Sequence, residues 1–315
     1  MAILVAGMHR SGTSAATRVI NLLGAEMPGN LMPPHIDFNA KGYWESLDIV
    51  RLNDELLESA MSSWDDVLAM DISRFPKTTL GEYRRKLSCI LDSNFQRSDF
   101  FVIKDPRLSR LLDVWLPTLN EWGAEPRLVI VVRNPMEVAE SLRRRENFSV
   151  EKSLLLWLRY MLEVIIGARG CLASFLCYDD LLLDWRGAMG RVARDLDIAW
   201  LDNQATIGPA VDEFLDESLR HCVSVGVTNP TPGLFEEMSD ALYSAIRLGQ
   251  VPPLDLVTSI RQKIDSLTNP CLPFLRDATS QRNRDKRQFD AIEQELHDHI
   301  HGLDGEIQAL RERYT

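Results

Sequence analysis

The sequence has no long hydrophobic run, and this absence excludes a large class of proteins. No stretch reaches the roughly 18 consecutive apolar residues that a helix needs to span a bilayer. The first residues also lack the basic region, the long apolar segment and the cleavage site of a secretory signal peptide. We therefore expect a cytoplasmic protein without a transmembrane segment.

Cysteine is scarce, and its spacing fits neither a disulfide scaffold nor a zinc site. The five cysteines are an odd number, and no two of them form a Cys-x-x-Cys pair. Histidine, cysteine and carboxylate residues nowhere cluster with the spacing of metal ligands. The sequence predicts free thiols in a reducing compartment and no metal site.

Positive charge is also in short supply. The chain has 35 lysines and arginines against 46 aspartates and glutamates, a formal net charge of −11. A domain that binds nucleic acid usually carries an excess of basic residues, so we expect neither nucleic acid nor an anionic membrane as the main partner. An anionic ligand would need a pocket that is locally basic.

The chain does contain short apolar runs that alternate with helical patterns. The apolar runs predict buried strands, at residues 3–7, 100–103, 128–132 and 173–178. Helical patterns follow, among them residues 15–23, 46–57, 138–145 and 153–166. Gly24 is placed to end the first of these helices. The alternation predicts an α/β fold, with a doubly wound parallel sheet flanked by helices.

Basic residues stand where the predicted strands end. Arg10, Lys104, Arg107 and Arg133 all fall at such ends. Ligands of open α/β sheets bind beyond the carboxyl ends of the strands. The sequence therefore predicts a basic rim on an otherwise acidic protein.

The loop after the first predicted strand has the spacing of a phosphate-binding loop. It reads Gly7-Met-His-Arg-Ser-Gly-Thr-Ser14, between a strand and a helix. A Walker A loop would have lysine directly after the second glycine, where this chain has Thr13. Main-chain N–H groups at the helix N-terminus can still bind an anion, and Arg10 supplies positive charge. The loop fits a terminal 5' phosphate better than ATP, because the lysine that reaches the β and γ phosphates is missing.

A second pattern follows the third predicted strand. Arg133 stands at the strand end, and Ser141 follows one to two turns into the next helix. A guanidinium group offers a planar set of donors to phosphate oxygens, and a hydroxyl can bind the same phosphate. This pair predicts a second phosphate site on the same rim.

Together, the two patterns resemble the sulfotransferases that use 3'-phosphoadenosine 5'-phosphosulfate (PAPS), a family with a P-loop NTPase-like fold. The resemblance covers roughly residues 1–225, and within this family the chain is more similar to the bacterial and carbohydrate-type branch. It implies an enzyme that transfers a sulfuryl group to a hydroxyl acceptor and releases adenosine 3',5'-bisphosphate. It implies that the 5' phosphosulfate is bound by the loop residues His9, Arg10, Ser11, Gly12, Thr13 and Ser14. Arg133 and Ser141 would bind the 3' phosphate.

The chain departs from the phenol and steroid sulfotransferases in two places. It has no Arg-Lys-Gly segment near its C-terminus, where only Arg220-His221 offers a substitute. It also lacks the Lys-x-His motif that carries the base of those enzymes, and Lys104-Asp-Pro106 stands there instead.

Catalysis requires positive charge at the departing oxygen and a base for the acceptor hydroxyl. Arg10 and Lys104 are the predicted cations. Glu45 is the predicted base, because related glycan enzymes use a glutamate after the phosphate loop and two aromatic residues precede it here. His35 and Asp105 remain alternatives for the base.

The last part of the chain changes character. Apolar residues recur from Phe289 to Tyr314 at steps of three and four, which predicts one stripe on a long helix. We divide the chain into a sulfotransferase domain, residues 1–275, and a helical extension, residues 276–315. The stripe fits packing on its own domain, self-association as a coiled coil, or a linker.

Two other functions stay open at this point. A P-loop kinase or other nucleotide-binding protein could use Asp105 or Asp179 as a metal ligand, although the Walker lysine is missing. A non-catalytic scaffold is the other alternative. For a sulfotransferase, the glutamate base favours a carbohydrate acceptor, with a lipid-linked sugar, a small-molecule alcohol or a carrier-bound intermediate as alternatives.

Overall fold

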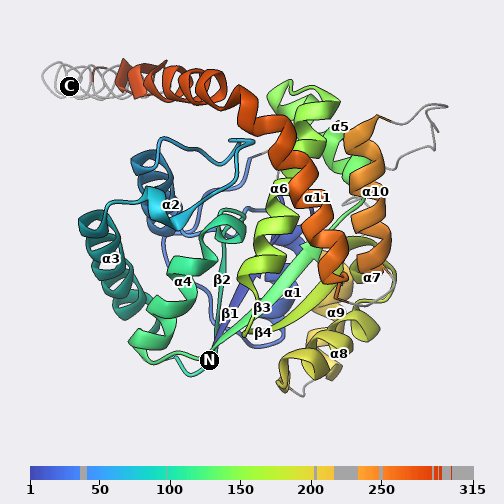
Figure 1. Ribbon diagram of the computed structural model, residues 1–315. Helices are drawn as coiled ribbons and strands as arrows, with labels where there is room; N and C mark the ends of the chain where they lie inside the picture. Colours follow the sequence, from blue (N-terminus) through green and yellow to red (C-terminus); the bar gives the residue numbers. More distant parts are fainter. Residues whose placement is uncertain are drawn as a thin grey trace, which may run out of the picture.

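A parallel four-stranded sheet forms the centre of the protein (Figure 1). The computed structural model describes residues 1–35, 41–96, 98–201, 204–215, 233–247, 251–285, 287–289, 291–292 and 299. The strands are β1 (Ala2–Ala6), β2 (Phe101–Lys104), β3 (Pro126–Val132) and β4 (Leu172–Cys177), in the order β2-β1-β3-β4. All neighbours are parallel, and Ala2 aligns with both Phe101 and Pro126.

Both faces of the sheet are buried, which explains why the strands read as continuous apolar runs. Successive side chains of a strand point to opposite faces. Accordingly Leu4 packs in one hydrophobic core and Ile3 and Val5 pack in the other. The predicted doubly wound α/β fold is confirmed.

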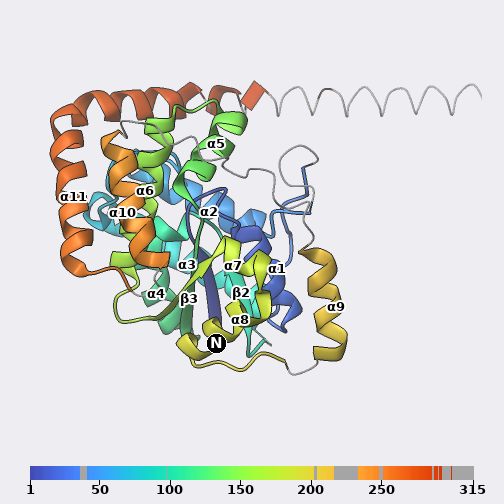
Figure 2. The ribbon, with the colours of Figure 1, turned by 90° about the vertical axis from the view of Figure 1, so that its right-hand side faces the viewer.

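Two layers of helices cover these cores (Figures 1 and 2). One face carries α2 (Leu47–Ser59), α3 (Lys77–Phe95), α4 (Leu108–Trp122), α5 (Pro135–Glu146), α6 (Val150–Gly167), α10 (Leu234–Arg247) and α11 (Leu254–Thr268), with the short 3₁₀ turns η1 (Ile72–Arg74) and η3 (Asn269–Cys271). The other face carries α1 (Thr13–Leu22), α7 (Tyr178–Leu183), α8 (Trp185–Leu196) and α9 (Gln204–Phe214).

The predicted elements agree with the observed ones to within three residues at each end. The helix predicted over residues 15–23 is α1, and Gly24 follows it with a φ of 110°, as a glycine that ends a helix does. Because the four strands run in parallel, the loops that follow them meet at one edge of the sheet. That edge receives Arg10, Lys104 and Arg133.

A further helix, over residues 272–285, lies across the end of the molecule that faces away from the N-terminus (Figures 1 and 2). The boundary predicted at residue 276 falls inside this helix. Of the predicted apolar stripe, Phe289 and Ile292 are exposed. The other residues of the stripe lie outside the described residues, and so does the pair Arg220-His221. The domain division and the self-association stay predictions. Among the described residues, no helix is long and apolar enough to cross a bilayer.

At Gly7 the loop after β1 passes close to the main chain of β3, and a substitution there tests whether this close approach is required. Its φ is 137°, and an added Cβ would lie 2.4 Å from the carbonyl oxygen of Val131. Gly7→Ala should lower the free energy of unfolding by about 2–4 kcal/mol, measured by urea denaturation.

Gly81 supplies the matched control, because it lies inside α3 with no atom within 4 Å of an added Cβ. Gly81→Ala should raise the stability by about 0.5–1 kcal/mol. If both substitutions have the same small effect, the close approach at Gly7 is not a constraint.

Candidate active site

The loop between β1 and α1 turns sharply before the helix begins and is fixed by two main-chain N–H groups. Arg10 and Gly12 have positive φ values of 69° and 89°, which turn the chain sharply into α1. The Ser11 N–H donates to the carbonyl of Met8 at 3.1 Å, and the Gly7 N–H donates to Ser109 Oγ at 2.9 Å. These contacts fix the loop against the start of α4.

The end of this loop fits an anion. No side chain of the described residues caps the N-terminus of α1, so the helix dipole and the first N–H groups face the loop. The Ser11 hydroxyl is buried and has no hydrogen-bond partner within the described part of the chain. A buried hydroxyl without a partner is unfavourable, and a bound oxyanion would satisfy it. The donors of the loop therefore suit a phosphate or sulfate group.

The second predicted motif lies against this loop. Arg10 Nε donates to Ser141 Oγ at 2.8 Å, and Arg133 Nη1 donates to the Arg10 carbonyl at 3.4 Å. Arg133 also pairs with Glu137 at 2.8 Å, and its guanidinium lies 4.9 Å from the centre of the Tyr178 ring. The structure thus brings Arg10, Arg133 and Ser141 together from two distant parts of the sequence.

Lys104 and Glu45 form a buried ion pair on the other side of the loop. Lys104 is 3% exposed and Glu45 is 6% exposed. The Lys104 ammonium also donates to Ser14 Oγ at 3.1 Å and to the Tyr43 carbonyl at 2.9 Å. The last residue of β2 therefore meets the first turn of α1. Glu45, the predicted base, is held by a predicted catalytic cation.

The two alternative bases have different surroundings. Asp105 is fully buried and accepts hydrogen bonds from Asn53 at 2.8 Å and from Arg107 at 2.9 Å and 3.0 Å. Arg107 in turn binds Asp54 with two hydrogen bonds, of 2.6 Å and 3.1 Å. Asp105 thus neutralises Arg107 rather than Lys104. His35 lies exposed on the surface.

His9 occupies an environment that its position in the motif did not reveal. Its ring packs 4.6 Å from the Trp64 ring and 5.8 Å from the Tyr160 ring, centre to centre. Burial, with the charges of Arg107 and other nearby cations, holds the pKa of His9 well below its usual value. Its Nε2 atom is buried and has no hydrogen-bond partner among the residues that the structure describes.

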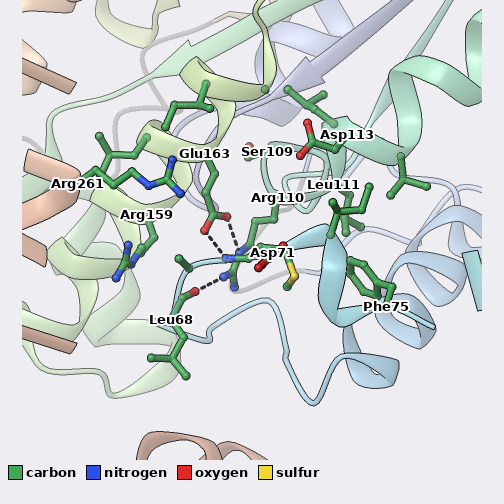
Figure 3. A pocket seen from close by; sticks show the side chains of 18 of the residues that line it. Leu68, Asp71, Phe75, Ser109, Arg110, Leu111, Asp113, Arg159, Glu163 and Arg261 are labelled. Atoms are coloured by element: carbon green, nitrogen blue, oxygen red, sulfur yellow. Dashed lines mark hydrogen bonds and ion pairs between the residues drawn. The ribbon is translucent and has the colours of Figure 1, made fainter. Parts of the chain in front are cut away.

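Two buried side chains, Arg110 and Tyr160, bind the main chain at and around Trp64. Arg110 donates to the carbonyls of Ser63, Asp66 and Leu68 at 2.6–3.0 Å and pairs with Glu163 at 3.0 Å (Figure 3). The Tyr160 hydroxyl donates to the Trp64 carbonyl at 2.6 Å. The 530 Å³ cavity of Figure 3 lies beside this support, and its Arg110 and Glu163 already satisfy each other.

A cavity of about 340 Å³ lies on the other side of Trp64. Its lining includes the Trp64 and Phe148 rings, stacked with centres 5.9 Å apart, and the carboxylates of Asp54 and Glu146. The helix over residues 272–285 closes one side, where Arg282 pairs with Asp65 and donates to Ser63 Oγ at 2.7 Å. Sequence reasoning missed this cavity, because its walls come from segments without a recognisable motif.

The support under Trp64 can be tested through stability. Arg110→Met removes the charge and the four hydrogen bonds but keeps much of the apolar side-chain volume. It leaves Glu163 without its ion-pair partner and three carbonyls without this donor, so the free energy of unfolding should fall by about 3–5 kcal/mol. Urea denaturation measures the change.

Arg261→Met is the matched control, because Arg261 lies on the same cavity but is half exposed and 3.7 Å from Asp265. Its effect should stay within about 0.5 kcal/mol. Equal losses for the two variants would remove the special role of Arg110.

Comparisons with known proteins place the chain only loosely. No family model matches the sequence, and no curated protein matches it. Among solved structures, a sulfotransferase domain from the curacin biosynthetic pathway is similar with a TM-score of 0.45 and 13% identity, over 77% of this chain and 96% of that one. A sulfotransferase domain from the olefin synthase of Synechococcus PCC 7002 is similar with a TM-score of 0.38 and 15% identity, over 83% and 93%. Structural similarity this low shows neither the family nor the activity of this chain.

Proposed function

We propose that this chain is a sulfotransferase that moves a sulfuryl group from PAPS to a hydroxyl acceptor and releases adenosine 3',5'-bisphosphate. The observation that carries the proposal is the 2.8 Å hydrogen bond from Arg10 to Ser141, which are 131 residues apart in sequence. It joins the loop predicted for the 5' phosphosulfate to the pair predicted for the 3' phosphate. A nucleotide with phosphates on the 3' and 5' oxygens of its ribose would need such a pair of adjacent sites.

The residues present fit the donor PAPS. Loop residues 10–14 and the N-terminus of α1, which no side chain of the described residues caps, would hold its 5' end, where the Ser11 hydroxyl needs a partner. Arg133 and Ser141 would hold the 3' phosphate. When bound, PAPS supplies an activated sulfuryl group.

Arg10 and Lys104 would supply the positive charge at the departing oxygen. Lys104 reaches the first turn of α1 from β2, and thus takes a place that the Walker lysine would take from within the loop. Charges held in a buried site stabilise a developing anion more strongly than charges in water. We therefore propose a transfer that needs no metal ion. Glu45 stays a prediction for the base, and its carboxylate would have to exchange Lys104 for the acceptor hydroxyl.

For the acceptor, we propose a carbohydrate hydroxyl. The 340 Å³ cavity is lined by the stacked rings of Trp64 and Phe148 and by the carboxylates of Asp54 and Glu146, which also pair with Arg107 and Arg145. Aromatic faces suit the apolar face of a sugar ring, and carboxylates accept hydrogen bonds from its hydroxyl groups. Trp64 connects this cavity to His9 in the phosphate loop.

The nucleotide preference is the direct test. Adenosine 3',5'-bisphosphate at 100 times its dissociation constant should stabilise the native state by about 2.7 kcal/mol, which raises the melting temperature by about 5 °C. Thermal denaturation with each nucleotide measures the shift. Stabilisation by ATP with Mg²⁺ and none by the bisphosphate would contradict the proposal and favour a kinase.

The role of Arg133 gives a second test. Arg133→Ala should weaken binding of adenosine 3',5'-bisphosphate by about ten- to a hundredfold, because a charge-assisted contact to the 3' phosphate is lost. Binding of adenosine 5'-phosphate, which has no 3' phosphate, should change little. Isothermal titration calorimetry measures both.

Arg143→Ala is the matched control, because Arg143 is an exposed arginine of α5 that pairs with Glu140 at 2.8 Å. It should leave both affinities near those of the unmodified protein. An equal loss for the two nucleotides in Arg133→Ala would remove Arg133 from the 3' phosphate.

A further inference from the structure

His9 combines two properties that are rarely found together in a structural residue. Its Nε2 atom is buried and has no hydrogen-bond partner in the part of the chain that the structure describes. Its ring is nevertheless fixed, packed at 4.6 Å on Trp64 and at 5.8 Å on Tyr160. A buried polar atom without a partner costs free energy, and each such atom in a native structure needs an explanation, of which a catalytic role is one.

Burial, together with the charges around His9, favours the neutral form of its ring. The groups that face it are Arg10 of the loop, Lys104 and Arg107 at the end of β2, Arg145 of α5 and the Tyr160 phenol of α6. Burial, and then the four cations, lower the pKa of His9 well below 6.5. A neutral imidazole with its proton on Nδ1 has a lone pair on Nε2 that can accept a proton.

His9 is a neighbour of residues from both proposed sites, the donor site and the acceptor cavity. Directly after it in sequence comes Arg10, which contacts Ser141, and beside it lies Trp64, which lines the 340 Å³ cavity. His9 is therefore adjacent in sequence to a residue proposed for the donor and in contact with a ring that lines the cavity proposed for the acceptor. A group that takes a proton from the acceptor has to lie near both sites.

We propose that His9 is the base that deprotonates the acceptor hydroxyl, an assignment that rests on the proposed function. In the step, the hydroxyl proton passes to His9 Nε2 while the acceptor oxygen forms a bond to sulfur. The bond from sulfur to the bridging oxygen breaks, and its electron pair stays on the 5' phosphate of adenosine 3',5'-bisphosphate. Arg10 and Lys104 face the charge that collects there.

This assignment gives Glu45 a different role from the one that the sequence predicts. The Glu45 carboxylate already binds Lys104 in a buried ion pair, whereas His9 Nε2 has no such contact among the described residues. Glu45 then positions Lys104 against Ser14, which donates to the Tyr43 carbonyl at 3.1 Å. It acts on the departing oxygen through Lys104, and so it is a positioning residue.

The experiment compares His9→Gln with Glu45→Gln, two substitutions that remove basicity and keep a polar side chain. The rate is the release of adenosine 3',5'-bisphosphate from PAPS, with water alone and with a set of monosaccharides as acceptors. His9→Gln should lower this rate by about a hundred- to ten-thousandfold. Its affinity for the bisphosphate should stay within about threefold of the original. Glu45→Gln should change rate and affinity together, through Lys104. His299→Gln, at an exposed histidine, is the matched control.

The pH dependence separates the two candidates further. Because the pKa of His9 is lowered, its neutral form persists from neutral pH to below 6.5, and kcat/KM for PAPS should fall only below that pH. Glu45→Gln should keep this acid limb, and His9→Gln should lose it. The imidazole resonances of the unmodified protein report the same ionisation by NMR, with and without the bisphosphate, even if a variant fails to fold.

The outcomes distinguish this inference from the proposed function. If the unmodified protein does not bind the bisphosphate, the proposed function fails and the role of His9 fails with it. If it binds the bisphosphate and His9→Gln keeps its rate, only the inference about His9 fails. A His9 ring that NMR finds protonated at neutral pH, with and without the bisphosphate, would also overturn it.

Discussion

The site depends on how closely the loop after β1 passes the neighbouring strands. A Cβ on Gly7 would lie 2.4 Å from the Val131 carbonyl oxygen, and a Cβ on Gly12 would lie 2.1 Å from the Tyr178 ring. Tyr178 directly follows β4, and the guanidinium of Arg133 lies over its ring. These close contacts set the loop against the ends of β3 and β4 together, and for this reason Arg10 can reach Ser141.

Buried arginines form the frame around this loop. Arg107 is bound by Asp54 and Asp105, and Arg110 by Glu163 and three carbonyls. Arg159 is bound by Asp265, Thr268 and the Val67 carbonyl. Such groups hold segments in place, because a buried charge that loses its partner is far less stable than the pair.

Local patterns in the sequence were enough to predict the fold and the two phosphate motifs. The strands are buried on both faces and therefore read as apolar runs, and Gly7 and Gly12 mark the turn that the loop needs. Two things depend on contacts between distant segments, and no local pattern shows them. One is the pairing of Glu45 with Lys104, and the other is the packing of Trp64 on His9. The sequence predicts Glu45 as the base from its position in the chain. That position does not show that the carboxylate binds Lys104.

Arg110 illustrates the same limit. It lies two residues into α4, in a helical pattern that reads as ordinary, yet it binds a segment of irregular structure more than forty positions earlier in the chain. Together with the hydrogen bond from the Tyr160 hydroxyl to the Trp64 carbonyl, that contact holds the segment whose Trp64 packs on the His9 ring. The support of a site is often harder to predict than the site itself, because it is made of main-chain carbonyls that carry no sequence signal.

The cations around His9 connect the strength of the proposed base to the donor. Arg10 and Lys104 disfavour a proton on the imidazole as long as their charges are not offset. An anion bound at the loop would offset those charges and raise the proton affinity of Nε2. By linkage, binding of the anion and protonation of His9 then favour each other. The base would be weak without the donor and stronger with it, so proton removal would be tied to the moment when a sulfuryl group is present to receive the acceptor oxygen.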